Sequence, residues 1–121
     1  NHPYKNAAIL TKAGVLVGIS IDGYWQQRNL PFMAGTVSTW GLSKEEALKT
    51  ITLNPAKILG LEKVAGSIEV GKDATLFISA GDALDMISNK VEKAFIQGRD
   101  IDLDNLHKQL DKRFSTKYGI K

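Results

Sequence analysis

An apolar run rich in β-branched residues, Val15 to Ile21, constrains the fold more than any other feature of this chain. Such runs are typical of strands that are buried on both faces, as in a parallel sheet. A helix is predicted just before it, over Pro3 to Lys12, with Gly14 as the C-terminal stop. Helix, stop and buried strand, in that order, form the second half of a βαβ unit. The sequence therefore predicts an α/β region, in which Asp22-Gly23 ends the strand.

Helical patterns continue as far as Gly60. One helix is predicted over Asn29 to Trp40, and Ser43 with Glu46 forms a capping box that starts the next, which has an apolar stripe of Ala47, Leu48 and Ile51. A third helix is predicted to restart at Asn54 as its cap, with Pro55 in the first turn. We expect these helices to pack on the flank of the strand.

The pattern changes from helical to strand-like between Gly60 and Gly66. The predicted strands are Ile68–Val70, Thr75–Ser79, Val91–Ile96 and Ile101–Leu103. The first two flank a tight hairpin turn at Gly71-Lys72-Asp73, and Gly98-Arg99 suits a two-residue turn between the last two. Asp104 is expected to cap a final helix, in which Leu106, Leu110 and Phe114 recur every four residues.

These patterns divide the chain into three parts and place it between the α/β and α+β classes. The parts are residues 1–61 with the helices and the parallel strand, residues 62–103 with a small antiparallel β unit, and residues 104–121 with the final helix.

Composition excludes several kinds of chemistry. The 121 residues contain no cysteine, so thiol nucleophiles, disulfides and thiolate metal sites are absent. No apolar run approaches the ~20 residues that span a bilayer, so no membrane partner is predicted. The net charge of +3 is small, and we interpret the basic cluster on the final helix as a solvated face, not a nucleic-acid patch. Its members are Lys108, Lys112, Arg113, Lys117 and Lys121.

Asp22 is the main candidate for chemistry. It stands at the C-terminal end of the predicted parallel strand, where α/β enzymes gather their reactive groups. A carboxylate there can bind a divalent metal or take a proton from a metal-bound water. The residues alone leave a second interpretation open, since Asp-Gly is also a turn in which Asp bonds to its own backbone. By contrast, Lys72-Asp73 and Glu45-Glu46 are explained by turn and cap chemistry.

Three motifs carry a resemblance to a known family. Thr52 to Leu61 resembles "T-x-N-P-A-x-x-L-G-L", Gly66 to Leu76 resembles "G-S-I-x-x-G-K-D-A-D-L", and Gly14 to Asp22 resembles "G-V-x-V-x-x-x-x-D". In this order they resemble the C-terminal part of the metal-dependent amidohydrolase superfamily, over roughly Pro3 to Leu103. The chain departs from the family at Thr75, where a second Asp is usual. The run from Arg28 to Ala34 is similar to "R-N-L-P-F-x-A" in the imidazolonepropionase-like branch.

The resemblance implies the last β/α elements of a (β/α)8 barrel, followed by part of a composite β-sandwich domain. It implies that Asp22 is a metal ligand and the base that activates the hydrolytic water, with zinc as the expected metal. Arg28 and Trp25, in the loop after Asp22, would contact the substrate, although the residues alone also fit a loop that is anchored by one aromatic side chain. The family's other ligands, an H-x-H pair, a Lys or Glu and further His residues, are missing here. His2 and His107 form no H-x-H pair, although His2 could line a pocket.

The expected function is therefore that of a fragment. The parent protein would hydrolyse a C–N bond in a small cyclic amide, amidine or peptide-like substrate, and this chain alone would be inactive and bind no metal stably. The alternative is a non-catalytic binding domain, or one that self-associates into a homo-oligomer. The chain begins with Asn1 and not with Met, which leaves the compartment open between the cytoplasm and, after removal of a leader, the periplasm or exterior.

Overall fold

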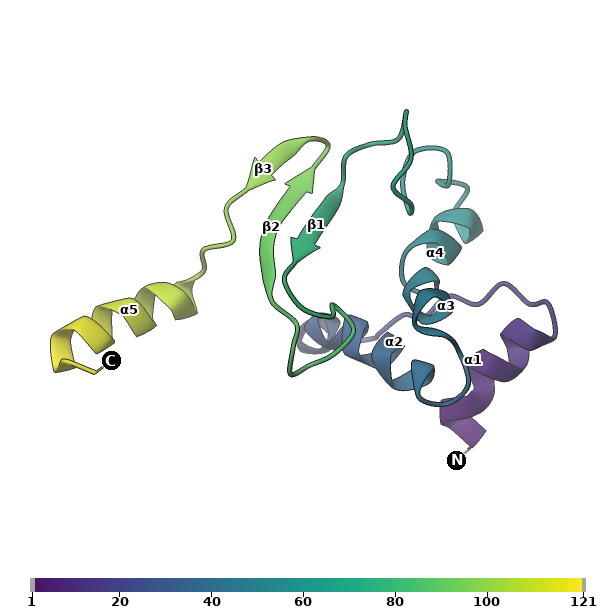
Figure 1. Cartoon of the computed structure of the whole chain (residues 1–121), viewed down its shortest axis with the longest axis horizontal. Coiled ribbons are helices and arrows are strands. Elements are labelled where there is room, and N and C mark those ends of the chain that lie inside the picture. The colour runs from purple at the N-terminus through teal and green to yellow at the C-terminus, as the bar shows by residue number, and fades with distance from the viewer. Residues whose placement is uncertain (1, 121) are drawn as a thin grey trace.

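The computed structural model describes residues 2–120, and side chains from Pro3 to Ile120. Within that range, helices make up the first half of the chain, and a small sheet and one further helix make up the second (Figure 1). The helices of the first half are α1 (His2–Lys12), the 3₁₀ helix η1 (Tyr24–Asn29), α2 (Leu30–Ser38), α3 (Lys44–Lys49) and α4 (Leu53–Ile58). The later elements are β1 (Leu76–Ser79), β2 (Val91–Ile96), β3 (Arg99–Ile101) and α5 (Leu106–Tyr118).

Local signals explain where the helices begin. The Ser43 hydroxyl accepts a hydrogen bond from the backbone N–H of Glu46, and the Ser43 N–H donates to the Glu46 carboxylate at 2.9 Å. This is the predicted capping box, and it is confirmed. The hydrogen bonds from the Ser43 backbone and hydroxyl lower the pKa of Glu46.

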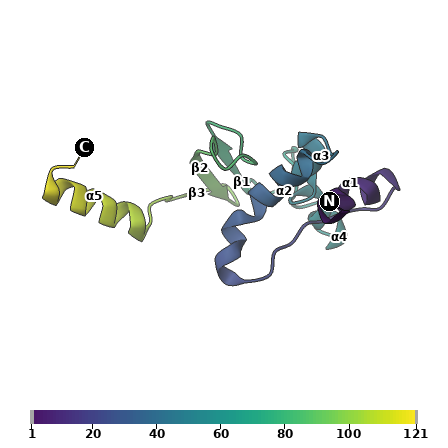
Figure 2. The same ribbon diagram turned by 90° about the horizontal axis from the view of Figure 1, so that it is seen from below.

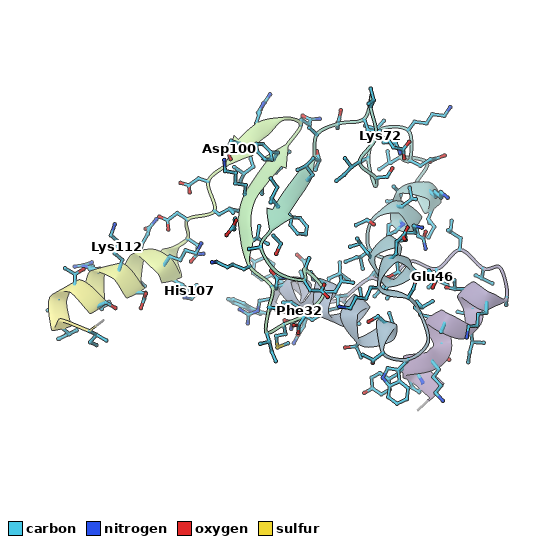
Figure 3. The ribbon with its side chains drawn as sticks, in the orientation of Figure 1. Phe32, Glu46, Lys72, Asp100, His107 and Lys112 are labelled. Carbon is cyan, nitrogen blue, oxygen red and sulfur yellow. The ribbon has the colours of Figure 1, made fainter. Side chains whose placement is uncertain are left out.

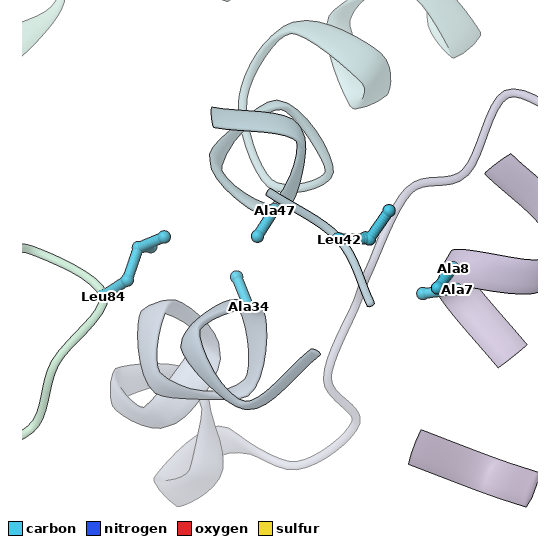
Figure 4. Packing of buried hydrophobic residues seen from close by; sticks show 6 residues of the cluster. All are labelled: Ala7, Ala8, Ala34, Leu42, Ala47 and Leu84. Atoms are coloured by element: carbon cyan, nitrogen blue, oxygen red, sulfur yellow. The ribbon is translucent and has the colours of Figure 1, made fainter. Parts of the chain in front are cut away.

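The core is small and lies where α2 contacts α1 and α3. Figure 4 shows its buried side chains, four of which are alanines: Ala7, Ala8, Ala34, Leu42, Ala47 and Leu84. Leu84 comes from the loop between β1 and β2, and it reaches α2 because Gly35 has no side chain. A Cβ added at Gly35 would lie 2.0 Å from the carbonyl oxygen of Leu84. This contact joins the loop of the sheet to the helices.

The sheet has three strands in the order β1-β2-β3, and both pairings are antiparallel. The predicted antiparallel unit is thus confirmed, with β2 at its predicted bounds. The turn between β2 and β3 lies one residue earlier than predicted, because Ile96 pairs with Arg99 and leaves Gln97 and Gly98 as the loop. Both have positive φ, at 51° and 78°, as tight hairpin turns of this kind require.

Two predicted strands are wrong. Val15–Ile21 is extended but forms no strand, since a parallel strand exists only when hydrogen-bonded to neighbours and no strand lies beside it among the described residues. The expected last β/α elements of a barrel are therefore present here only as an extended segment and its helices. Ile68–Val70 likewise pairs with nothing, so no hairpin forms around Lys72.

Two predicted helix caps are also wrong. The first residue of α4 is Leu53, so Asn54 lies inside the first turn together with Pro55. Asn105, not Asp104, caps α5, because its side chain accepts the hydrogen bond from the backbone N–H of Lys108. Asp104 instead accepts a hydrogen bond from the Gln109 amide, which lowers the pKa of Asp104.

The chain leaves much of its surface uncovered. It exposes 9342 Å², whereas a compact monomer of 13.2 kDa exposes about 6,400 Å². Figures 1 and 2 show why, since α5 stands away from the sheet at the end of an extended connection and the sheet has no layer packed along its length. No helix in the described range is long and apolar enough to cross a membrane.

Candidate active site

The segment that leads to Asp22 is attached to the loop between α3 and α4. The N–H of Ile19 donates to the carbonyl of Thr50 at 2.9 Å, and the side-chain amide of Asn54 donates to the carbonyl of Val17 at 2.8 Å. Val17, Ile19 and Ile21 are half-buried, while Gly18 and Ser20 between them are exposed. This alternation is that of an extended chain with one face covered.

Asn54 is a positioning residue that the sequence analysis missed. The Asn-Pro pattern indicated a helix cap, and no local signal in the sequence shows that the amide instead reaches a backbone carbonyl 37 residues earlier. Its role is to hold the segment on the helices, and so to set where Asp22 lies.

Asp22 ends this segment and is exposed. Gly23 follows with φ of 97°, and η1 begins at the next residue. Among the described residues, no protein group donates a hydrogen bond to the Asp22 carboxylate, whereas Asp82, Asp85 and Asp102 all accept from nearby backbone N–H groups. The turn interpretation of Asp22 therefore receives no support from its hydrogen bonds, and its carboxylate is available to another group.

The two predicted substrate contacts lie in η1. Trp25 and Arg28 are both exposed and three residues apart, so they lie on the same side of a 3₁₀ helix. Trp25 packs edge-to-face against Tyr24, with ring centroids 5.5 Å apart. Tyr24 is itself 80% exposed, and the sequence analysis did not single it out. The loop after Asp22 thus presents two aromatic rings and one guanidinium to solvent.

The described residues do not form a metal site on their own. No three carboxylate, imidazole or thiol side chains come together in the range that the structure describes, whereas a catalytic zinc needs about three protein ligands. Figure 3 places His107 on α5, away from α3, which carries Glu46. The side chain of His2 lies outside the described range. Asp22 could supply one ligand at most.

Surface hollows lie elsewhere among the described residues, and two of them are not lined by Asp22, Trp25 or Arg28. The first lies between α2 and the loop of residues 82–86, where the Lys44 ammonium pairs with the Asp82 carboxylate at 2.5 Å. This hydrogen bond lowers the pKa of Asp82 and raises that of Lys44. The second lies between the sheet and α5 and is mainly acidic, with Glu92, Asp100, Asp102 and Asp104 in its lining.

Lys72 is bound within its own loop, in agreement with the structural role predicted for it. Its ammonium, with a side chain only 11% exposed, donates to the Ser67 hydroxyl and to Glu69 at 3.0 Å. The pKa of Glu69 is lowered most of all by the hydrogen bond that the Ser67 hydroxyl donates to the Glu69 carboxylate, and next by the one from Lys72. Thr75, which departs from the family motif, accepts a hydrogen bond from the backbone of Gln97.

The chain matches the amidohydrolase family over residues 4–104. It therefore belongs to that family, and the resemblance seen in its motifs is confirmed. The imidazolonepropionase of Flavobacterium psychrophilum is 29% identical over 107 residues, which are 80% of this chain and 26% of that protein. The 5-methylthioadenosine/S-adenosylhomocysteine deaminase of Moorella thermoacetica is 39% identical over 77 residues, which are 54% of this chain and 18% of the deaminase.

Solved structures agree with this assignment. An amidohydrolase from Thermotoga maritima superposes with a TM-score of 0.75 and 39% identity, over 82% of this chain and 26% of that structure. A prolidase crystallised with N-methylphosphonate-L-proline shares the fold, with a TM-score of 0.65 at 24% identity, over 81% of this chain and 26% of the prolidase. The chain spans about a fifth to a quarter of the length of the relatives that it matches.

Proposed function

We propose that this chain is the C-terminal portion of an amidohydrolase, and that in the complete enzyme Asp22 carries the acid–base step of C–N bond hydrolysis. The single observation that carries the proposal is the position and exposure of the Asp22 carboxylate. In a region that matches the family, it ends an extended segment anchored to two helices, and its carboxylate is exposed without a hydrogen-bonding partner among the described residues.

Each candidate residue has a role that follows from its chemistry. The Asp22 carboxylate would accept a proton from the attacking water and pass it to the leaving nitrogen. Arg28 would bind a carboxylate or carbonyl group of the substrate through its planar guanidinium, and Trp25 would form an apolar wall beside it. The substrate class is a small cyclic amide, amidine or peptide-like amide. A divalent metal, zinc by family resemblance, would supply Lewis acidity, with its remaining ligands outside this chain.

Exposed surface supports the view that the functional protein is larger than the chain. The segment that carries Asp22 has one uncovered face, on which Leu16 is 45% exposed. A further part of the enzyme that supplies strands would cover that face and complete the ladder. We therefore expect the isolated chain to be inactive. Amidase or deaminase turnover by the purified chain with zinc added would refute this.

The test in the longer protein is Asp22→Asn. We expect kcat/KM for a panel of cyclic amides and amidines to fall by about 10²-fold or more, the usual contribution of a general acid–base group. The matched control is Asp100→Asn, which changes an exposed carboxylate on β3 and should leave turnover unchanged. Full activity of Asp22→Asn would contradict the proposal.

The alternative function is a non-catalytic domain that binds a partner or associates with itself, and the exposed apolar surface favours it. The two functions differ in what the gene encodes upstream. An H-x-H motif followed by separated His residues supports the enzyme, whereas an initiator Met directly before Asn1 supports the independent domain.

A further inference from the structure

Helix α5 is the part of the chain that the family assignment does not explain. The family match ends at residue 104, and α5 begins at Leu106. Among the described elements, the closely packed pairs are β1 with β2, β2 with β3, α2 with α3, α1 with α2, and α2 with η1. None includes α5, and Figures 1 and 2 show it projecting from the end of the sheet. A helix of 13 residues is only marginally stable in water without tertiary contacts, so α5 needs a partner.

The unpartnered face of α5 is a single apolar ridge. It consists of four side chains that are spaced four residues apart and exposed to solvent: Leu106 (65%), Leu110 (37%), Phe114 (44%) and Tyr118 (63%). The Phe114 and Tyr118 rings stack with centroids 6.3 Å apart. The ridge therefore has two leucines in its N-terminal half and two aromatic rings in its C-terminal half. A second copy running antiparallel would place each leucine against an aromatic ring.

The distribution of charge along residues 100–118 also favours an antiparallel pair. Acidic residues gather just before the helix, where Asp100, Asp102 and Asp104 line the hollow beside the sheet and outnumber Lys93 and Lys108, which line it as well. The C-terminal half of α5 is basic, and Arg113 and Lys117 lie over the Phe114 and Tyr118 rings. In an antiparallel pair the acidic end of each chain meets the basic end of the other. A parallel pair would set like charges together, and an anionic membrane surface would repel the acidic end.

We propose that α5 is a homodimerisation helix that pairs with α5 of a second copy in antiparallel orientation. The two-fold axis passes near residue 112, so that Leu106 lies by the partner copy's Tyr118 and Leu110 by its Phe114. Such an isologous contact requires a self-complementary surface. Residues 100–118 supply one, since the apolar ridge lies on α5 and the acidic residues lie just before it. Because the ridge follows i±4 spacing, the helices would cross at about −50°. The proposal is independent of the catalytic role of Asp22.

The size of the surface sets the strength of the dimer. One ridge of four side chains buries less than the ~1,200 Å² of a stable interface, so the dimer should be weak and dependent on concentration. The first experiment is sedimentation of the whole chain from micromolar to millimolar concentration. Phe114→Glu should raise the dimer dissociation constant about tenfold or more, since Phe114 lies near the centre of the contact. The control Ile87→Glu, at a 95% exposed apolar residue in the loop before β2, should not change it.

A second experiment tests orientation and does not depend on the stability of the variants. The chain has no cysteine, so Leu106→Cys and Tyr118→Cys each introduce one thiol. In the antiparallel pair, the two copies of residue 106 are separated by about 18 Å along the helix axis. A short bis-maleimide should therefore join the two variants when they are mixed, and should join neither variant to itself. Self-linking of Leu106→Cys, a monomer at every concentration, or an equal effect of Ile87→Glu and Phe114→Glu would overturn the proposal.

Discussion

At the residue scale, the absence of a side chain at Gly35 permits α2 to lie close against the loop between β1 and β2. Gly35→Ala would place a methyl group 2.0 Å from the Leu84 carbonyl oxygen, so either α2 or the loop must move. We expect a loss of about 1–3 kcal/mol in the free energy of unfolding, because overpacking against backbone outweighs the better helix propensity of alanine. Urea denaturation measures it. Gly18→Ala is the control and should cost less, because the nearest atom to its methyl group would be the flexible end of Ile58 at 3.2 Å, with Pro55 and the Thr50 carbonyl farther away.

The pair of Lys44 and Asp82 ties the same loop to α3, and its contribution depends on pH. The pKa of Asp82 is lowered from 3.8, so its share of stability is present above that value and is lost as the pH falls through the folded-state pKa. The pKa of Lys44 is raised from 10.5, so its share is present below that value and is lost as the pH rises through the folded-state pKa. In Lys44→Met, the pKa of Asp82 should rise toward its ordinary value in an NMR titration. An unchanged Asp82 titration would show that the pair does not persist in solution.

At the element scale, α3 depends on its capping box. Ser43→Ala removes the oxygen that accepts the Glu46 N–H, and we expect a cost of about 1 kcal/mol in the free energy of unfolding. The pKa of Glu46 should rise as well, since it loses the Ser43 hydroxyl. The control is Thr116→Ala, because the Thr116 hydroxyl donates only to a carbonyl of its own helix. Equal stability of Ser43→Ala and the wild type would contradict the role of the box.

The elements that the sequence predicted well are those whose signals are local. The Ser43–Glu46 box and strand β2 are specified by residues close together in the chain, and both were located correctly. Val15–Ile21 and Ile68–Val70 have strand-like composition, but a strand also needs a neighbour to pair with. Asp22 was singled out by its place after the apolar run. Asn54 could not be singled out in this way, because its hydrogen bond to the Val17 carbonyl depends on how the folded chain brings residues 17 and 54 together.

At the scale of the whole molecule, the chain exposes roughly 2,900 Å² more than a compact monomer of its mass. Part of that excess lies on α5 and along the segment of residues 15–21, and the proposals assign a different partner to each of these two surfaces. A second copy would cover α5, and the rest of the enzyme would cover the extended segment. Experiment can distinguish these two partners, because only the rest of the enzyme would add hydrogen bonds to the backbone of residues 15–21.

Hydrogen–deuterium exchange distinguishes the two partners, because it measures the protection of residues 16–21 and of α5 separately. In the isolated chain, the amides of residues 16–21 should exchange rapidly, except that of Ile19, which is bonded to the Thr50 carbonyl at 2.9 Å. In the longer protein the same amides should become protected, because neighbouring strands would accept their hydrogen bonds. Dimerisation through α5 should instead protect α5 and leave residues 16–21 unchanged. If residues 16–21 exchange equally fast in the longer protein, then Asp22 does not end a barrel strand, and its proposed catalytic role loses its structural basis.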